Sequence, residues 1–441
     1  QARRAGLRGL GSSTGRKQAS MEPALLPKQK TSFEPESTLE VFYTGGALRL
    51  SPDGLFAACA CSDEVKVVEI ATGAVKQTLA GDSEPITAIA VHPDGKQVFA
   101  ASRSLQVKRW DLETEKPLKT WKAHEAPVAD MDVDPTGTLL ATASADRSIR
   151  VWDIDKGFCT HALRGHSAVV QVCRFHPDRS KLMLFSGGDD AEVRVWDLRR
   201  KGCAAVLKQH FSAITSLAIS PCGGLLLSGG RDKVVNVWDL STNKSKHTVP
   251  VYEPVEGLVA LPGGVMTGGK ASKDVLAFMT AGERGQLKAW RADTAKCLWE
   301  EEELAGNEGG YVGLLALPKG AGAAAITADF RVRLLSYAKG GAATAEKGQE
   351  LIGHNDDVID LRFVGGEEDP ESRVAVATNS DQIRIYDVAT MGCLATLGGH
   401  TDTVLTLDAR ISSGGKQILA SGGKDNSVRV WDVAAGRCVA R

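Results

Sequence analysis

The chain has 441 residues, and its 43% hydrophobic and 24% charged residues are close to globular averages, which excludes a disordered chain and a coiled coil. Glycine is enriched, at 47 residues, without a collagen-like period, and this favours short strands joined by tight turns. No stretch approaches the roughly 18 apolar residues of a membrane-spanning helix, so we expect a soluble protein.

The net charge of −1 hides an uneven distribution. Residues 1–31 carry seven basic residues and one acid, a balance of +6, which leaves −7 for the rest of the chain. We expect residues 1–37 to form a basic, disordered tail through which any direct RNA contact would pass. Residues 1–20 precede Met21, and we expect them to be a non-native upstream extension, although their Arg-rich, acid-free composition also suits a transit peptide.

One strand pattern recurs nine times along the chain and ends each time at an equivalent position, here called the slot residue. Five slots are Trp followed by Asp, and successive slots are 42 to 52 residues apart. This period is typical of a four-stranded propeller blade. The slot residues are Val68, Trp110, Trp152, Trp196, Trp238, Trp290, Leu335, Tyr386 and Trp431.

Histidine and aspartate recur in a fixed phase to the slot. An aspartate lies six residues before it, in a tight turn, and a histidine lies about thirty residues before it, with His354 and Asp329 in incomplete copies. We predict that each set joins a Ser or Thr of the second strand in a buried polar network that fixes the sheet. The four complete sets are His124, Asp146 and Trp152; His166, Asp190 and Trp196; His210, Asp232 and Trp238; and His400, Asp425 and Trp431.

These repeats predict an all-β protein. A four-stranded sheet cannot bury both of its faces alone, so successive sheets should pack around an axis as a β-propeller. Nine blades exceed the usual four to eight of one ring, so we predict a seven-bladed propeller over residues 38–348 and the first two blades of a second propeller over 349–441. A strand at Thr38 to Tyr43 could close the first ring as the outer strand of its seventh blade, in competition with a strand at residues 349–352.

A recurring His, Ser and Asp also suggests a hydrolase, with His124, Ser144 and Asp146 as one candidate set. Several copies in equal phase argue against this interpretation, because enzymes do not multiply a nucleophile in every repeat. The chain also lacks a G-x-S-x-G elbow. We therefore expect no enzymatic activity and no catalytic residues.

The sequence predicts no metal site and no cofactor site. The nine cysteines include no C-x-x-C pair, and the glycine-rich segment 263–272 has the wrong spacing for a phosphate loop and is better explained as an inserted loop. Five cysteines lie seven residues after a slot, where we expect buried, unpaired thiols on outer strands in a reducing compartment: Cys159, Cys203, Cys297, Cys393 and Cys438. The acidic runs 300–303 and 367–369 should be solvated, or dock basic partners.

The periodic Trp-Asp, Gly-His and turn-Asp pattern places residues 40–441 in the WD-repeat family. Within it, the chain resembles the UTP-B proteins of the nucleolar small-subunit processome. The most similar segments are FYTGGALRLSPDG (42–54), SRSLQVKRW (102–110), the regular repeat at 121–154, TVPVYEPVEGL (248–258) and VATNSDQIRIYD (376–387).

This resemblance implies a non-catalytic two-ring scaffold in the nucleolus that acts in pre-rRNA processing and small ribosomal subunit biogenesis. Its partners would be protein subunits of a large ribonucleoprotein assembly, with pre-rRNA or small nucleolar RNA contacted indirectly or through the basic tail, and without a membrane or a small-molecule substrate. The alternative comes from Trp196 to Arg199, a W-D-x-R pattern similar to that by which some propellers dock onto cullin-type ubiquitin ligases as substrate receptors.

Overall fold

The computed structural model describes residues 41–262, 276–301, 310–337, 345–353, 357–366, 369–389, 393–412 and 415–441. The predicted basic tail at 1–37, the glycine-rich segment 263–272 and His354 lie outside these residues. Parts of both acidic runs also lie outside them. Among the described residues, no helix is long and apolar enough to cross a membrane.

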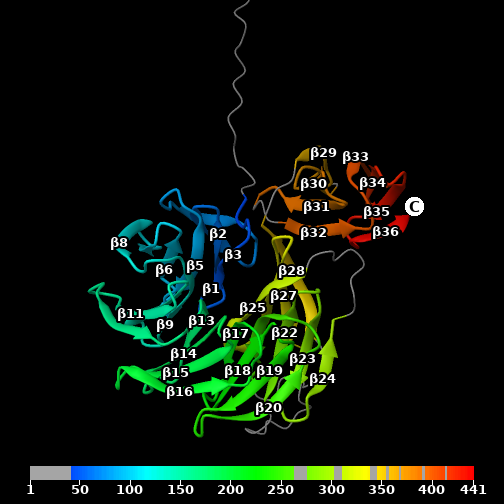
Figure 1. Cartoon of the computed structure of the whole chain (residues 1–441). Coiled ribbons are helices and arrows are strands. Elements are labelled where there is room, and N and C mark those ends of the chain that lie inside the picture. Colours follow the sequence, from blue (N-terminus) through cyan, green and yellow to red (C-terminus); the bar gives the residue numbers. More distant parts are fainter. Residues whose placement is uncertain are drawn as a thin grey trace, which may run out of the picture. The chain divides into compact units, whose positions relative to one another are not determined.

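The described chain forms nine four-stranded antiparallel sheets, each built from four consecutive strands (Figure 1). The first three sheets are β1 (Leu48–Leu50), β2 (Phe56–Cys61), β3 (Glu64–Glu69) and β4 (Val75–Leu79); β5 (Ile86–Val91), β6 (Gln97–Ser102), β7 (Gln106–Asp111) and β8 (Lys116–Lys122); and β9 (Val128–Val133), β10 (Leu139–Ser144), β11 (Ser148–Asp153) and β12 (Cys159–Arg164).

The next three sheets are β13 (Val170–Phe175), β14 (Met183–Gly188), β15 (Glu192–Asp197) and β16 (Gly202–Lys208); β17 (Ile214–Ile219), β18 (Leu225–Gly230), β19 (Val234–Asp239) and β20 (Lys244–Pro250); and β21 (Val255–Ala260), β22 (Ala277–Gly282), β23 (Leu287–Arg291) and β24 (Lys296–Glu300).

The last three sheets are β25 (Tyr311–Ala316), β26 (Gly322–Thr327), β27 (Arg331–Tyr337) and β28 (Ala345–Ile352); β29 (Val358–Phe363), β30 (Arg373–Thr378), β31 (Gln382–Asp387) and β32 (Cys393–Gly398); and β33 (Val404–Ile411), β34 (Gln417–Gly423), β35 (Val428–Asp432) and β36 (Arg437–Ala440). One short 3₁₀ helix, η1 (Pro318–Gly320), connects β25 to β26. The predicted all-β class is therefore confirmed.

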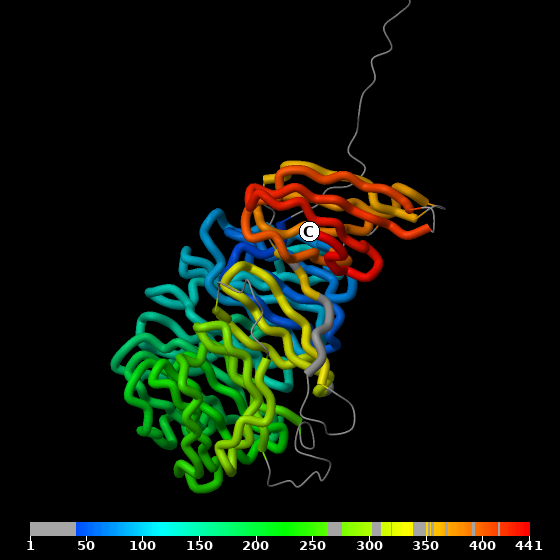
Figure 2. The backbone as a smooth tube through the Cα atoms, turned by 90° about the vertical axis from the view of Figure 1, so that its right-hand side faces the viewer, coloured from blue at the N-terminus to red at the C-terminus, as the bar shows by residue number. Residues whose placement is uncertain are grey.

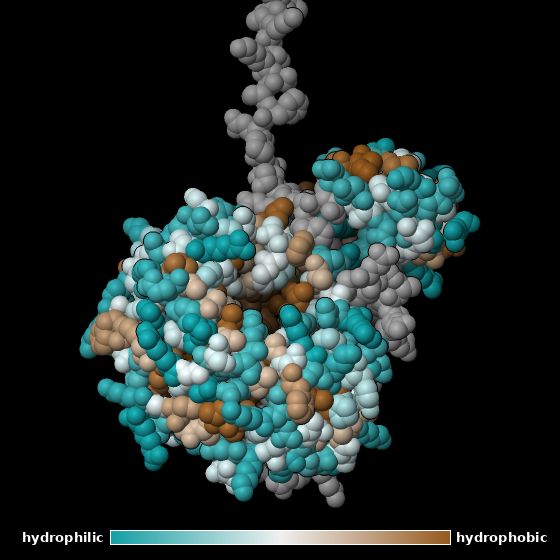
Figure 3. All heavy atoms as spheres, viewed as in Figure 1, coloured by the Kyte–Doolittle hydropathy of each residue, from teal (hydrophilic) through white to brown (hydrophobic). Residues whose placement is uncertain are grey.

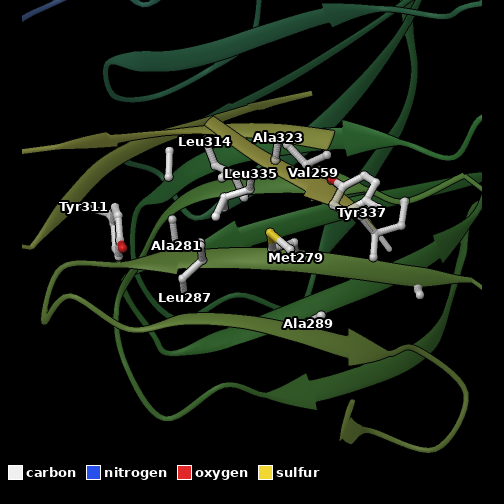
Figure 4. Packing of buried hydrophobic residues seen from close by; sticks show 13 residues of the cluster. Val259, Met279, Ala281, Leu287, Ala289, Tyr311, Leu314, Ala323, Leu335 and Tyr337 are labelled. Carbon is white, nitrogen blue, oxygen red and sulfur yellow. The ribbon is translucent and has the colours of Figure 1, made fainter. Parts of the chain in front are cut away.

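Hydrophobic clusters lie between neighbouring sheets rather than within them. Each sheet from the first to the sixth shares a cluster with the next, and a further cluster joins the seventh sheet to the first. Figure 4 shows one of them, in which Met279 of the sixth sheet lies among Leu314, Leu335 and Tyr337 of the seventh. The first seven sheets thus pack in a closed cycle, which Figure 1 shows as an arrangement around a common axis.

The slot residues explain how this cycle is held together. Trp152 of the third sheet packs in the cluster that it shares with the second, and Trp196 of the fourth packs against the third. Leu335 and Val68 take the same place between the sixth and seventh sheets and between the seventh and first. Each of these side chains is buried against the preceding sheet, so the sequence repeat marks the contact between sheets.

The eighth and ninth sheets share a cluster of their own, which includes Trp431 (Figure 2, orange to red). Their packing follows the rule of the first seven sheets, because the slot residue of the ninth sheet contacts the eighth.

The junction after the seventh sheet differs from the prediction. Residues 41–44 form no strand, and Thr38 lies outside the described residues, so the expected closing strand at Thr38 to Tyr43 is not observed. The competing segment supplies the outer strand, because β28 pairs with β27. The segment before β1 instead contacts the residue after β28: the Gly353 carbonyl accepts hydrogen bonds from the backbone N–H groups of Phe42 and Tyr43, both at 2.9 Å. The predicted boundary between residues 348 and 349 falls inside β28.

Candidate functional site

The third sheet shows how the predicted polar network is assembled. His124 lies in the loop before β9, Thr142 in β10, Asp146 in the turn after β10, and Trp152 in β11. His124 Nδ1 lies 2.8 Å from Asp146 Oδ2, and His124 Nε2 lies 2.7 Å from Thr142 Oγ1. Trp152 Nε1 donates to the same hydroxyl at 3.1 Å. One buried threonine therefore joins the histidine to the tryptophan.

Electrostatics fix the protonation of this network. Burial lowers the pKa of His124 despite the neighbouring Asp146, so the imidazole is neutral at neutral pH. Burial acts to raise the pKa of Asp146, but hydrogen bonds from Ser148 and His124 prevail and lower it to about 2. A neutral imidazole donates from Nδ1 to the carboxylate and accepts the Thr142 hydroxyl proton at Nε2. In this arrangement every donor of the network meets an acceptor.

The structure builds the same network in three further sheets. In each, the histidine Nδ1 faces the turn aspartate, and one serine hydroxyl lies 2.7 Å from the histidine Nε2 and 2.8 Å from the tryptophan Nε1. The sets are His166, Asp190, Ser186 and Trp196; His210, Asp232, Ser228 and Trp238; and His400, Asp425, Ser421 and Trp431.

The hydrolase candidate set is not assembled. Ser144 lies two residues from Thr142 on β10, and its hydroxyl is directed to the carbonyls of Ala126 and Pro127 at 3.0 and 3.1 Å. His124 contacts Thr142 instead, and this hydroxyl already accepts a hydrogen bond from Trp152. A buried hydroxyl held between an imidazole and an indole is unsuited to act as a nucleophile, because no substrate can approach it.

Sequence reasoning missed a basic residue that stands two positions before most slots. In the second sheet Lys108 Nζ donates to the Gly81 carbonyl at 2.6 Å, and in the third Arg150 Nη1 donates to the Ala123 carbonyl at 2.9 Å. Both carbonyls precede the position of the network histidine, so this base fastens the loop that enters the sheet. The signal was available, because the base occurs in eight of the nine repeats, and Asn236 stands in the fifth.

Five cysteines occupy equivalent places, as the sequence predicts, but the expectation that they are buried is wrong. Cys159, Cys203 and Cys438 are exposed, and Cys297 and Cys393 are partly exposed. Each pairs with its slot residue at a β-bulge on the outer strand, and each thiol points to the carbonyl two residues later, as Cys159 does to His161 at 3.2 Å. The phase is the same because the bulge recurs, and the side chain is accessible because no further strand covers this edge.

The W-D-x-R segment lies at the end of β15. Trp196 is buried, whereas Arg199 is exposed and donates through its guanidinium to the Ser180 carbonyl at 2.5 Å. A contact with the loop between β13 and β14 of the same sheet thus accounts for the placement of Arg199. Among the described residues, no group of three or more His, Cys, Asp or Glu could hold a metal ion.

An ionic cluster around the buried Asp130 joins the inner strands of three sheets, of which the first is not a neighbour of the other two. Asp130 of β9 accepts a hydrogen bond from Arg49 of β1 at 2.5 Å and another from Arg174 of β13. It also accepts the backbone N–H of Cys173 at 3.0 Å. This carboxylate therefore links the first, third and fourth sheets.

Comparison with known proteins identifies the repeat. The family described as "WD domain, G-beta repeat" matches residues 73–111, 115–153, 157–197, 201–239 and 391–432. The matches cover four consecutive repeats and the last one. They leave out the four repeats whose slot is not Trp followed by Asp.

Longer relatives match nearly the whole chain. Transducin beta-like protein 3 of Bos taurus is 39% identical over 411 residues, which cover 91% of this chain and 49% of the relative. The proteins of the same name from Homo sapiens and Mus musculus are 40% and 36% identical over 93% of this chain. The chain spans about half the length of these relatives.

Proposed function

The chain belongs to the WD-repeat family, and from this premise we propose that it is a non-catalytic scaffold of the small-subunit processome, acting in pre-rRNA processing and small ribosomal subunit biogenesis in the nucleolus. WD repeats imply protein–protein interaction, and the proposed partners are protein subunits of a large ribonucleoprotein assembly. The observation that carries the non-catalytic part is the recurrence of one buried His, Asp and Trp network in four sheets. These side chains are buried and hydrogen-bonded to one another, so partners would bind at the loops and edges of the sheets.

The proposed role in the small-subunit processome rests on the repeats that depart from the regular Trp-Asp pattern. The segments that resemble UTP-B proteins include the two irregular hairpins at 42–54 and 102–110, and similarity to transducin beta-like protein 3 extends over more than nine-tenths of the chain. Features that depart from the regular repeat are not required by the fold itself. A match that includes them supports a shared role more strongly than a match to regular repeats would.

We also propose that the first seven sheets form one propeller and that the eighth and ninth begin a second. The closed cycle of clusters, together with the hydrogen bonds from Phe42 and Tyr43 to Gly353, supports a first domain that ends near residue 353. On β29, Ile359, Leu361 and Phe363 alternate along the strand and are 41%, 48% and 49% exposed. Figure 3 shows an apolar area over this sheet, as expected for a sheet face that lacks a neighbouring blade.

Affinity purification of the tagged protein from cells tests the role. Enrichment of ribosome assembly factors together with pre-rRNA, and nucleolar signal of a fluorescent fusion, are the expected results. Enrichment of cullin adaptors that depends on Arg199 would instead favour a ligase receptor. Arg199→Ala and the matched variant Arg200→Ala, at the neighbouring exposed position, separate a specific contact from a general loss of charge.

Limited proteolysis with mass mapping tests the domain proposal. We expect residues 41–353 to resist as one fragment, while residues 357–441 are cleaved earlier because one face of the eighth sheet lacks a cover. Equal resistance of both segments in a monomer would contradict the seven-plus-two division.

A further inference from the structure

A concavity of about 380 Å³ lies where the third sheet meets the loop that leads to the fourth. Three arginines line it from different elements of the same sheet: Arg147 from the turn between β10 and β11, Arg150 from β11, and Arg164 from the end of β12. Ser148 adds a hydroxyl, and Glu125 and Asp146 add two carboxylates. Apart from Gly165, the residues that line the pocket are polar or charged, and its volume suits a single side-chain group.

The two carboxylates offset only part of the charge of the three arginines. Asp146 keeps its negative charge, because its partners are neutral: His124 at 2.8 Å and the Ser148 hydroxyl at 2.6 Å. Glu125 pairs with Lys122 at 2.7 Å, and this hydrogen bond lowers the pKa of the Glu125 carboxyl. Within the described part of the chain, neither Arg147 nor Arg164 makes an ion pair. The positive charge of the pocket therefore remains available to a ligand.

This concentration of arginine is particular to the third sheet. The position of Arg147 is held by Leu105 in the second sheet and by Ala191 in the fourth, according to the strand registers. Lys208 stands at the position of Arg164 in the fourth sheet, but there it pairs with Glu192 at 2.7 Å. The polar network does not need Arg147, because the fourth sheet builds the same network with Ala191 at this position.

We propose that this pocket binds a phosphorylated serine or threonine in a segment of a partner protein. A phosphate group carries close to two negative charges at neutral pH and offers several acceptor oxygens. One guanidinium group can donate two parallel hydrogen bonds to two of these oxygens. The size of the phosphate suits a site lined by three arginines, which supply the donors, because the Ser148 hydroxyl already donates to Asp146.

The lining favours a phosphorylated protein over nucleic acid. No Phe, Tyr or Trp lines the pocket, and the ring of His166, which does, is buried, so an unpaired base would find no exposed surface on which to stack. The chain outside residues 1–31 also has a net charge of −7, which disfavours a long polyanion but not a single phosphate group.

Fluorescence anisotropy of the whole chain with short dye-labelled peptide pools tests the proposal. One pool carries phosphoserine at its centre, a second carries serine, and both have degenerate flanks. We expect the phosphoserine pool to bind at least about tenfold more tightly. The double variant Arg147→Ala/Arg164→Ala should abolish this difference, whereas Lys208→Ala, at the equivalent position of the fourth sheet, should preserve it.

A second variant guards against a folding artefact. Arg147→Lys/Arg164→Lys keeps the charge but loses the paired hydrogen bonds, and should retain only part of the preference. Equal binding of the two pools by the unmodified chain overturns the proposal. It is also overturned if the phosphoserine pool does not bind while a short single-stranded RNA binds and loses affinity in the double alanine variant.

Discussion

Replacing Thr142 by valine measures what the polar network contributes to stability. The substitution keeps the branched shape of a fully buried side chain and removes only its hydroxyl. That hydroxyl accepts the Trp152 indole N–H at 3.1 Å and lies 2.7 Å from His124 Nε2. Valine therefore leaves two buried polar atoms without a partner. At about 1 to 3 kcal/mol for each unsatisfied group, with partial relaxation, the free energy of unfolding should fall by about 2 to 4 kcal/mol.

The sixth sheet supplies an internal control, because it has the tryptophan and the threonine without the histidine. Trp290 Nε1 donates to Thr280 Oγ1 at 2.9 Å, and the strand register places the exposed Tyr252 at the position of the network histidine. Thr280→Val leaves one buried donor unsatisfied and should lower the free energy of unfolding by about 1 to 2 kcal/mol. The third sheet should thus lose about twice as much as the sixth.

Urea unfolding of both variants, followed by tryptophan fluorescence, measures the two losses in the free energy of unfolding. The comparison requires that this free energy falls with urea concentration with the same slope as in the unmodified chain. Matched slopes allow the midpoints to be converted into differences in free energy. Equal losses in the two sheets would mean that the histidine contributes nothing through this hydroxyl. A loss below about 1 kcal/mol for Thr142→Val would show that the buried groups find other partners.

Four further predictions follow from charge and burial. Burial raises the pKa of Asp132 to about 6, so its charged form is disfavoured in the fold. Asp132→Asn should therefore raise the melting temperature at pH 7.5, by an amount equivalent to about 1 kcal/mol, and much less at pH 4. A lower melting temperature at both pH values would contradict this prediction. Trp196→Ala should cost about 3 to 5 kcal/mol through lost packing between sheets, against about 1 to 3 for His166→Ala, in thermal melts. Burial lowers the pKa of His166, so the fold loses stability as pH falls below about 6.5, and this loss should be smaller in the alanine variant. Deleting residues 1–31 should remove most of any RNA affinity and reduce its salt dependence, and unchanged binding would indicate a folded RNA-binding surface.

The repeat made much of the fold predictable from the sequence. A Trp slot, a turn aspartate and a loop histidine in fixed phase define the sheet and its polar network. Trp196 and Trp431 therefore lie between sheets, as their phase indicates. Periodicity works here because each sheet uses the same few residues for the same contacts.

Phase alone could not decide which side chain reaches a partner. Thr142 and Ser144 are two residues apart and so share one face of β10, and only the path of the preceding loop selects Thr142 for His124. The thiol of Cys159 keeps its phase because of a bulge, yet phase says nothing about exposure at an outer edge. Closure of the seventh sheet depends on Gly353 and Phe42, which are distant in sequence and carry no local signal.

The irregular sheets show what the network must preserve. In the regular third sheet, Asp146 of the turn accepts the Glu125 backbone N–H of the entering loop, so a carboxylate in the hairpin holds the loop. In the second sheet the carboxylate has moved to the loop, where Asp82 stands at the histidine position and accepts hydrogen bonds from Ser102, at 2.7 Å, and from Ser104 of the turn.

The sixth sheet makes the same exchange. Glu253 of the entering loop accepts the backbone N–H of Arg284, the residue that replaces the turn aspartate, at 3.3 Å. Its carboxylate packs so closely on Gly282 that a Cβ there would lie about 2 Å from it, so this exchange depends on a glycine. Burial raises the pKa of Glu253, as expected for an acid enclosed between loop and hairpin. In the second and sixth sheets a carboxylate of the loop thus takes over the contact that the turn aspartate makes in the regular sheets, and both repeats form complete sheets without the His and Asp pair.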